Sequence, residues 1–337
     1  MNFIKGVLIF GLVLTGVALA GEGGRYKLLI GNTQGNNVVV YSQSSGNYLG
    51  ELVSAQTGLL DRPDALVIAP NGDLCISTGT NTGNSAVLRF NLKTGEYLGV
   101  MASGGGLNRP YGYAWGPDGM LYVASFQSDQ ILRYDGETGD FVDVFAQGDA
   151  LPGGLNGPDD IVFGPDGRLY ITTQGSVAVN GSPTFPGLPS QVLAYDIETG
   201  ASSVFIDQPV ASPEGFGFVS LLGIKFGPDC NNGACDVWVS DFANDIRRYD
   251  LDGNLLQTLS TNYTGTLPSS NFVGNLSFGK QGNLFSVGFN NNELEAPGAI
   301  MRWDSNGNPL PRANQNDAIF VPLTYDLSRA IGILAID

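Results

Sequence analysis

The sequence contains no histidine, and this absence excludes several kinds of chemistry. A Ser-His-Asp triad and a Cys-His pair both depend on an imidazole as general base, so neither operates in this chain. Haem ligation through histidine is excluded for the same reason. Base catalysis, if there is any, would fall to an Asp, Glu, Lys or Tyr side chain.

Basic residues are scarce, because 16 lysines and arginines face 32 aspartates and glutamates, and the formal net charge is −16. Such an acidic chain repels phosphate backbones and anionic membrane surfaces. We therefore expect no nucleic acid and no membrane surface among its partners. The charge suits a soluble exported protein.

Long apolar runs are absent beyond residue 20. Within residues 1–20, Lys5 is followed by the apolar run GVLIFGLVLTGVALA, which ends in the small-x-small site Ala18-Leu19-Ala20. This pattern predicts a secretory signal peptide over residues 1–20. A membrane anchor is the alternative, although the run is short for spanning a bilayer. We expect cleavage, a secreted or periplasmic protein, and no membrane span in the mature chain.

Cysteine is also rare, with three in 337 residues. Cys230 and Cys235 bracket the turn DCNNGACD, which in an exported protein predicts a disulfide that staples a β-hairpin. A metal site would need more ligands than these two thiols. Cys75 lies in the alternating segment DLCIST, and we expect a buried free thiol there.

What the sequence does contain is a pattern repeated six times, such as SAVLRFNLKTGEYLG and DQILRYDGETGDFVD. The aromatic residues of the pattern lie 44 to 61 positions apart, at Tyr41, Phe90, Tyr134, Tyr195, Tyr249 and Trp303. A regular period of this length marks a repeat architecture. Each full unit carries four strand signals, and the turns after the third signal begin with Asn or Asp, whose side chains cap backbone N–H groups.

Four strands repeated six times predict an all-β fold, a six-bladed β-propeller. The N-terminal segment YKLLIGNTQ (26–34) matches a second strand, and the C-terminal segment AIGILAID (330–337) matches a first strand. Both chain ends would therefore close one clasp blade. We expect residues 21–337 to form a single propeller domain, because two separate domains would leave both ends unpaired.

The strings GPDGxLYVxS and xILRYDxxTG resemble those of the NHL-repeat propellers. These are related to the gluconolactonase/regucalcin-type lactonases and to the streptogramin-lyase-like propellers, and the resemblance covers nearly all of residues 26–337. It implies the fold more than the activity, because this scaffold carries many unrelated functions. The streptogramin lyase relatives are expected to use a histidine base, so their mechanism does not carry over to this chain. The resemblance also implies that ligands bind at the mouth of the central channel, where the innermost strands begin.

Alignment of the repeats predicts two rings of residues at this mouth. The outer ring consists of Asp64, Tyr111, Asp159, Leu222, Gly274 and Ile331. The next ring inward consists of Ala65, Gly112, Asp160, Gly223, Asn275 and Gly332. Asp160 should point into the channel among small residues, where a carboxylate needs a partner such as water, Asn275 or a bound cation.

The lactonase relatives hold a divalent cation with Glu, Asn and Asp side chains. Here the resemblance offers Asp64, Asp159 and Asp160 as candidate ligands for Ca²⁺, with Asn275 beside them. Calcium takes six to eight oxygens, and this set supplies only part of that number. The family's ligand set is therefore not reproduced. Turn capping after proline is the alternative role for Asp64 and Asp159.

Two segments break the regular spacing, and an inter-blade segment could also reach the mouth. Residues 175–190 form an insertion in blade four, which is either a binding loop or a decorative insertion. Residues 289–297 occupy the same kind of connection in blade six. The inter-blade segment DQPVASPEGFGFVS (207–220) carries Glu214, which we also predict at the mouth.

These observations predict a monomeric, exported binding module for a small molecule, glycan or protein. The predicted ligand-binding residues at the channel mouth are Asp64, Tyr111, Asp159, Asp160, Glu214 and Asn275. The alternative is a calcium-dependent lactonase or esterase of the gluconolactonase type. In that enzyme the metal would polarise the carbonyl, and Asp159 or Asp160 would assist proton transfer.

Overall fold

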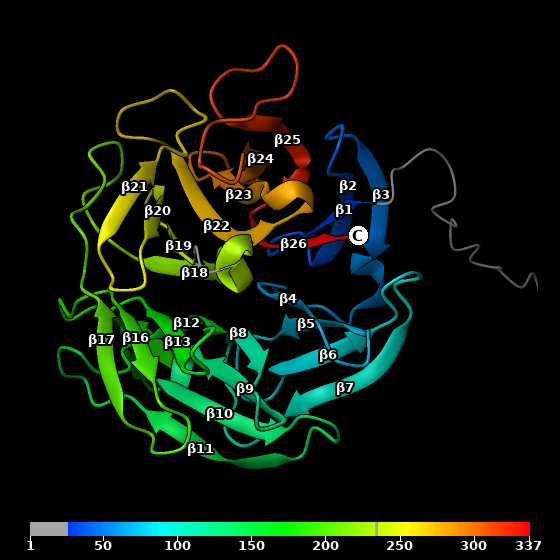
Figure 1. The fold of residues 1–337 in the computed structure, drawn as a ribbon. Coiled ribbons are helices and arrows are strands. Elements are labelled where there is room, and N and C mark those ends of the chain that lie inside the picture. Colours follow the sequence, from blue (N-terminus) through cyan, green and yellow to red (C-terminus); the bar gives the residue numbers. More distant parts are fainter. Residues whose placement is uncertain (1–25, 233–234) are drawn as a thin grey trace, which may run out of the picture.

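The structure, a computed structural model, describes residues 26–232 and 235–337. The predicted signal peptide, residues 1–20, lies outside the described residues. Six four-stranded antiparallel sheets are arranged in a ring around a central axis (Figure 1). The predicted six-bladed β-propeller is confirmed.

We number the blades in chain order and begin with the clasp blade, which contains both chain ends. The clasp blade runs outward as β26 (Ala330–Ile336), β1 (Lys27–Asn32), β2 (Asn37–Ser42) and β3 (Tyr48–Val53). Blade two comprises β4 (Leu66–Ile68), β5 (Leu74–Thr78), β6 (Ala86–Phe90) and β7 (Tyr97–Ser103). Blade three comprises β8 (Pro110–Trp115), β9 (Met120–Ser125), β10 (Gln130–Asp135) and β11 (Phe141–Gln147).

The remaining three blades follow the same order from the innermost to the outermost strand. Blade four comprises β12 (Pro158–Phe163), β13 (Leu169–Thr173), β16 (Val192–Tyr195) and β17 (Ser202–Ile206). Blade five comprises β18 (Leu221–Phe226), β19 (Val237–Asp241), β20 (Asp245–Tyr249) and β21 (Leu255–Leu259). Blade six comprises β22 (Asn271–Phe278), β23 (Leu284–Asn290), β24 (Pro297–Trp303) and β25 (Ile319–Ser328).

The clasp joins the two ends of the chain as predicted. Strand β1 pairs with β26 in an antiparallel register that places Leu29 opposite Leu334. Backbone hydrogen bonds between these strands close the ring, because the innermost and second strands of this blade come from opposite ends of the chain. Opening the clasp would expose the edges of both strands.

The repeated aromatic residues explain why the sheets pack against one another. All six lie on the third strand of their blade and are no more than 6% exposed: Tyr41, Phe90, Tyr134, Tyr195, Tyr249 and Trp303. The core lies between neighbouring sheets, where for example Phe90 of blade two packs in one cluster with Val38 and Val40 of the clasp blade. Burial of each large apolar side chain contributes about 1.5–3 kcal/mol.

The predicted turn caps are also present. The Asp135 carboxylate accepts hydrogen bonds from the backbone N–H groups of Glu137 and Thr138, at 3.0 and 2.7 Å. These N–H groups stabilise the charged form, so they lower the pKa of Asp135. Short tight turns of this kind let each blade return on itself without a long loop.

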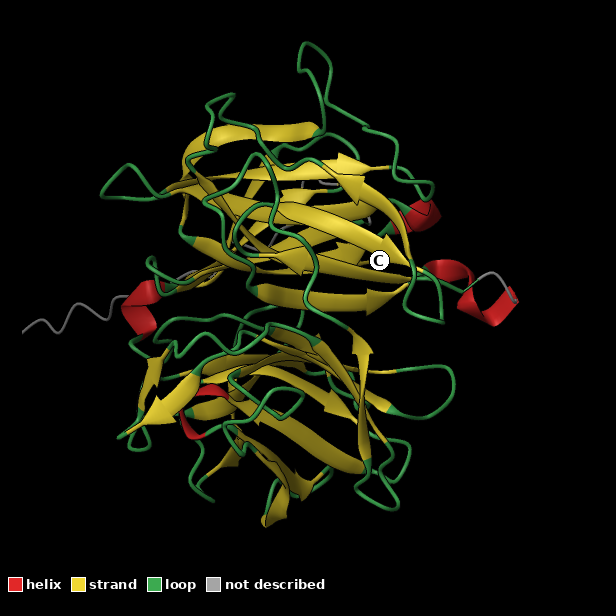
Figure 2. Cartoon of the chain, turned by 90° about the vertical axis from the view of Figure 1, so that its left-hand side faces the viewer, coloured by secondary structure: helices red, strands yellow, loops and turns green. Residues whose placement is uncertain are grey.

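The predicted disulfide between Cys230 and Cys235 is confirmed, and it staples the connection between β18 and β19. Cys75 is a buried free thiol, and burial raises its pKa to about 12. The helices of the described residues are short 3-10 turns in the loops (Figure 2). No helix among those residues has both the length and the apolar character needed to cross a membrane.

Candidate functional site

A cavity of about 210 Å³, which we call the mouth cavity, lies where the innermost strands begin. It brings together five of the six residues of the predicted outer ring, namely Asp64, Tyr111, Asp159, Leu222 and Ile331. Each occupies an equivalent position at or just before the start of an innermost strand, in a different blade. Gly274, the sixth, is not among the residues that line the cavity.

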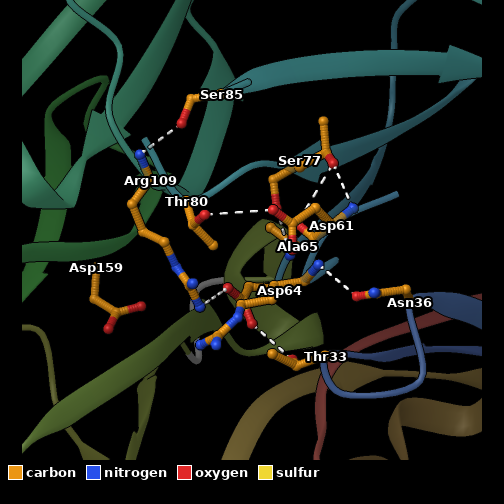
Figure 3. Close-up of polar contacts among 12 residues, drawn as sticks. Thr33, Asn36, Asp61, Asp64, Ala65, Ser77, Thr80, Ser85, Arg109 and Asp159 are labelled. Carbon is orange, nitrogen blue, oxygen red and sulfur yellow. Dashed lines mark hydrogen bonds and ion pairs between the residues drawn. The ribbon is translucent and has the colours of Figure 1, made fainter. Parts of the chain in front are cut away.

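Asp64 forms a buried ion pair with Arg109 at one side of the mouth cavity (Figure 3). The distance from Arg109 Nη2 to Asp64 Oδ2 is 2.7 Å, and the two side chains are only 8% and 5% exposed. The hydroxyl of Thr33 donates to Asp64 Oδ1 at 2.7 Å. These contacts join the clasp blade, blade two and blade three, so Asp64 has a structural role at the mouth.

Asp159 is the second carboxyl group in the mouth cavity, and its environment favours the neutral form. It is 4% exposed and accepts a hydrogen bond from the side chain of Gln174. Burial raises the pKa of Asp159 well above its usual range, and the neighbouring Asp160 and Asp64 raise it further. Gln174 and Arg109 only partly oppose this shift. In Figure 3 its carboxyl group points toward the guanidinium of Arg109, without a hydrogen bond between them.

Tyr111 supplies a phenol and an aromatic surface to the cavity. Its ring packs against that of Phe126, with the ring centroids 4.6 Å apart, and Arg109 Cζ lies 5.1 Å from its centroid. Burial raises the pKa of Tyr111 to about 12, so the hydroxyl keeps its proton at neutral pH. The group is therefore a hydrogen-bond donor rather than a base.

Arg329 is a further cationic residue of the mouth cavity. Its Cζ lies 5.2 Å from the ring centroid of Phe289. None of the ion pairs among the described residues involves its guanidinium, and none of their hydrogen bonds starts from it. Burial lowers the pKa of Arg329, and the nearby Asp64 opposes that shift. A half-buried guanidinium without a partner favours the binding of an anion.

Sequence reasoning missed Arg109 and Arg329, although both occupy a recognisable position. Each directly precedes an innermost strand and adopts a left-handed backbone, with φ of 59° and 48°. A non-glycine residue in this region costs roughly 1–3 kcal/mol, and such residues cluster at functional sites. In the sequence these residues stand in the tripeptides NRP (108–110) and SRA (328–330), which do not by themselves indicate a left-handed backbone.

Asp160 and Asn275 lie together, but outside the mouth cavity. Asp160 Oδ2 accepts hydrogen bonds from Lys225 Nζ at 2.6 Å, from Asn275 Nδ2 at 3.1 Å and from the Ile224 N–H at 3.2 Å. The predicted need for a partner is thus met by Asn275 and by Lys225, which sequence reasoning did not identify. The ammonium group of Lys225 balances the negative charge of Asp160, so no bound cation is needed for that purpose.

The residues present do not fit a calcium ion. The described residues contain no group of three or more carboxylate, cysteine or histidine ligands arranged around one point. Arg109 and Lys225 form ion pairs with Asp64 and Asp160, so each places a positive charge beside a carboxylate that a metal would need. The predicted metal ligands are therefore engaged in contacts within the protein.

Glu214 lies apart from the mouth cavity. Its carboxylate accepts a hydrogen bond from the Ser260 hydroxyl at 2.5 Å, and its backbone carbonyl accepts from the Ser269 N–H at 2.6 Å. It lines a separate hollow of about 440 Å³, together with residues of blades five and six such as Gln257 and Trp303. These contacts hold the inter-blade segment against the connection between β21 and β22 rather than at the mouth.

The insertion 175–190 forms part of the cavity wall. It contains the hairpin β14 (Val177–Val179) and β15 (Ser182–Thr184), and its residues Pro183 and Phe185 line the mouth cavity. The hairpin is anchored by Asp129, which accepts from the Ala178 N–H at 2.6 Å and from the Gly157 N–H at 3.0 Å. The contact with the cavity favours a binding loop over a decorative insertion.

The loop 289–297 of blade six has a different arrangement. Glu293 accepts hydrogen bonds from the side chains of Asn290 and Tyr325, at 3.0 and 2.7 Å. The residues of this loop are not among those that line the mouth cavity. Its polar groups are used to hold the loop onto strand β25.

No protein-family model matches the chain, and no curated protein sequence matches it. Solved structures are similar in fold. A chain in the crystal structure of a nidogen/laminin complex is 13% identical, with a TM-score of 0.61 over 92% of this chain and 98% of that chain. A protein of unknown function from Bacteroides caccae is 13% identical, with a TM-score of 0.60 over 93% and 99% of the two chains.

A streptogramin B lyase is 18% identical, with a TM-score of 0.54 over 93% of this chain and 84% of that chain. These likenesses show the fold alone. They agree with the predicted resemblance to streptogramin-lyase-like propellers at the level of architecture. The relation to NHL-repeat and gluconolactonase-type propellers stays a prediction.

Proposed function

We propose that this protein is an exported binding module that takes a small anionic ligand into the mouth cavity. The observation that carries the proposal is the unpaired guanidinium of Arg329 in a cavity whose other charges are already balanced. Arg109 is neutralised by Asp64, and Asp159 favours its neutral form. In a chain of formal net charge −16, this cavity is therefore a local site for an anion.

The other groups of the cavity suit a small carboxylate. The Tyr111 hydroxyl can donate a hydrogen bond to an anion, the raised pKa of Asp159 lowers its repulsion of one, and the rings of Phe126 and Phe242 offer an apolar wall. A carboxylate that accepts from Arg329 forms a charge-assisted hydrogen bond in a partly dry site. Benzoate combines this charge with an aromatic body, so it is a suitable probe.

The test is a calorimetric titration of benzoate into the mature protein. We expect millimolar or tighter binding that Arg329→Gln weakens about tenfold or more, because a hydrogen bond to a charged group is worth about 1.5–3 kcal/mol. Arg312→Gln is the matched control, since Arg312 is exposed and donates to Asn47 far from the cavity. No benzoate binding, or equal losses in both variants, would overturn the proposal.

The alternative is a calcium-dependent lactonase or esterase of the gluconolactonase type. The neutral Asp159 carboxyl in the cavity supports proton transfer, but the pairing of Asp64 and Asp160 with cations speaks against the metal. Lactone hydrolysis that requires calcium and disappears in Asp159→Asn would favour this enzyme over a binding module. A screen of lactones and esters that finds no hydrolysis would count against the lactonase or esterase.

Export is part of the proposal and rests on two features. One is the signal-like segment 1–20, and the other is the disulfide between Cys230 and Cys235, which persists in oxidising compartments.

A further inference from the structure

A larger hollow, which we call the side groove, lies next to the mouth cavity. The side groove has a volume of about 630 Å³ and shares Gln174, Phe185 and Phe242 with the mouth cavity. One wall comes from the insertion in blade four, through Phe185 and Leu188. The other comes from the segment that leads into β18, through Phe218. The two hollows are therefore adjacent, and these three side chains form part of the lining of both.

The side groove is apolar and uncharged. None of the described residues that line it carries a charge, although 14% of the whole sequence is charged. Phe185 and Phe218 are 66% and 44% exposed, and both face the same groove. Single exposed apolar residues are common on protein surfaces, but several that line one groove mark a binding site.

Each of the two glutamines of the side groove has one amide atom engaged within the protein. Gln174 donates to Asp159, and Gln208 Oε1 accepts from the Ser190 N–H at 2.9 Å. A peptide would bring a backbone N–H and C=O with every residue, and these groups need partners when they lose water. The groove offers few free partners, so it suits an apolar chain better than a peptide backbone.

The wall of the groove is held in place before any ligand arrives. The hydrogen bonds from Ala178 and Gly157 to Asp129 fix the hairpin β14–β15 against blade three. The Thr184 hydroxyl also donates to the Val177 carbonyl at 2.8 Å across the hairpin. A preformed wall lowers the entropy cost of binding.

We propose that the ligand is an elongated carboxylate, with its charged head at Arg329 in the mouth cavity and an apolar body along the side groove. The inference of a charged head depends on the proposed function, and the inference of an apolar body depends on the side groove. The guanidinium of Arg329 lines the mouth cavity only, Leu188 and Phe218 line the side groove only, and Phe185 lines both. This arrangement matches a molecule with one charge at one end.

The test compares benzoate with 4-phenylbutyrate, which has the same head and ring with a longer apolar chain. Each buried methylene tightens binding about fourfold, so we expect 4-phenylbutyrate to bind at least tenfold more tightly. 4-Phenylbutylamine has the same apolar body with a cationic head, and it should not bind beside Arg329. Equal affinity for the two carboxylates would overturn the elongated ligand while leaving the mouth proposal intact.

Variants separate the groove from the mouth. Phe218 lines the side groove but not the mouth cavity, so Phe218→Ala should weaken 4-phenylbutyrate binding several-fold and leave benzoate binding unchanged. Phe141→Ala is the matched control, because Phe141 is 41% exposed on the outer strand β11, away from both hollows. Leu188→Ala gives a second test on the opposite wall.

The outcomes distinguish the two proposals. If neither carboxylate binds the unaltered protein, the anion site itself is wrong and the elongated ligand fails with it. If both bind but Phe218→Ala and Leu188→Ala behave like Phe141→Ala, the side groove does not hold the ligand. Melting temperatures of the variants, which should stay close to that of the unaltered protein, show that any loss of binding is local.

Discussion

Replacing Arg109 by methionine removes the cationic half of a buried ion pair that joins three blades of the ring. Methionine keeps much of the side-chain length, so the main change is the loss of the charge and its hydrogen bonds. Asp64 would then keep the Thr33 hydroxyl as its side-chain partner and remain buried as a charged group. A carboxylate held in this way loses its hydration and its ion-pair partner, and the only cation of the mouth cavity that stays near it is Arg329, which forms no ion pair with it.

The expected magnitude follows from the burial of the pair. Breaking a buried ion pair by removing one partner costs about 3–5 kcal/mol. The cost of protonating an ordinary aspartate at about pH 7 sets a similar limit, near 4 kcal/mol. Because a whole domain is stable by about 5–15 kcal/mol, Arg109→Met should lose a large share of the stability.

The assay is urea unfolding, followed by tryptophan fluorescence, with a surface ion pair as control. Arg133 pairs with Asp143 at 2.5 Å, but the two side chains are 24% and 44% exposed. Arg133→Met should therefore cost only about 0–1 kcal/mol. The double variant Arg109→Met/Asp64→Asn should recover most of the loss, because it leaves no buried charge.

The reasoning would be refuted by either of two results. One is a loss for Arg109→Met that is no larger than the loss for Arg133→Met. The other is a double variant that is as unstable as Arg109→Met alone, since the cost would then arise from packing rather than from an unpaired charge. A smaller loss at about pH 4, where carboxylates take up protons, would support the charge argument.

Three further predictions concern other parts of the chain. Burial raises the pKa of Asp245 to about 7, above the pKa of an aspartate in the unfolded chain. The folded state therefore keeps this proton more tightly, so the free energy of unfolding is highest at low pH and falls as the pH rises toward 7. Asp245→Asn should flatten this pH dependence in urea unfolding between low pH and pH 7. Gly112→Ala should lower the melting temperature strongly, because the new Cβ would lie 2.5 Å from Asp160 Cα. Gly119→Ala has open space around the new Cβ, so it should cost only about 1–2 kcal/mol of unfolding free energy from its left-handed backbone. Mass spectrometry of the exported protein should find Gly21 as its first residue, and an uncleaved N-terminus would refute the signal peptide.

Much of the fold could be predicted because its signals are local and repeated. Alternating apolar residues, turn sequences and the period of the aromatic positions each recur in six copies, so an error in one copy does not change the answer. The same alignment placed Asp64, Tyr111 and Asp159 at equivalent strand starts, and these residues do line one cavity. Equivalent positions in a closed ring face the same axis, which is why the alignment worked.

The candidate site was less predictable because its side-chain partners come from different blades. Arg109 and Asp64 are 45 positions apart, and Lys225 and Asp160 are 65 apart, and no repeat pattern relates them. Glu214 lies away from the mouth for the same reason, because its hydrogen-bond partner Ser260 is 46 positions away in the sequence and follows β21. Which side chains meet depends on how the blades close.

The sequence by itself therefore determined the blades, the clasp, the disulfide and the ring of residues at the mouth, because each depends on a local pattern or on its repetition. Only the tertiary structure decided which carboxylates are paired with cations, that Arg329 is left without such a partner among the described residues, and that Phe185 of the insertion lines both the mouth cavity and the side groove. The physical reason is that charge balance and cavity shape are properties of side chains from separate blades, and these meet only when the ring closes.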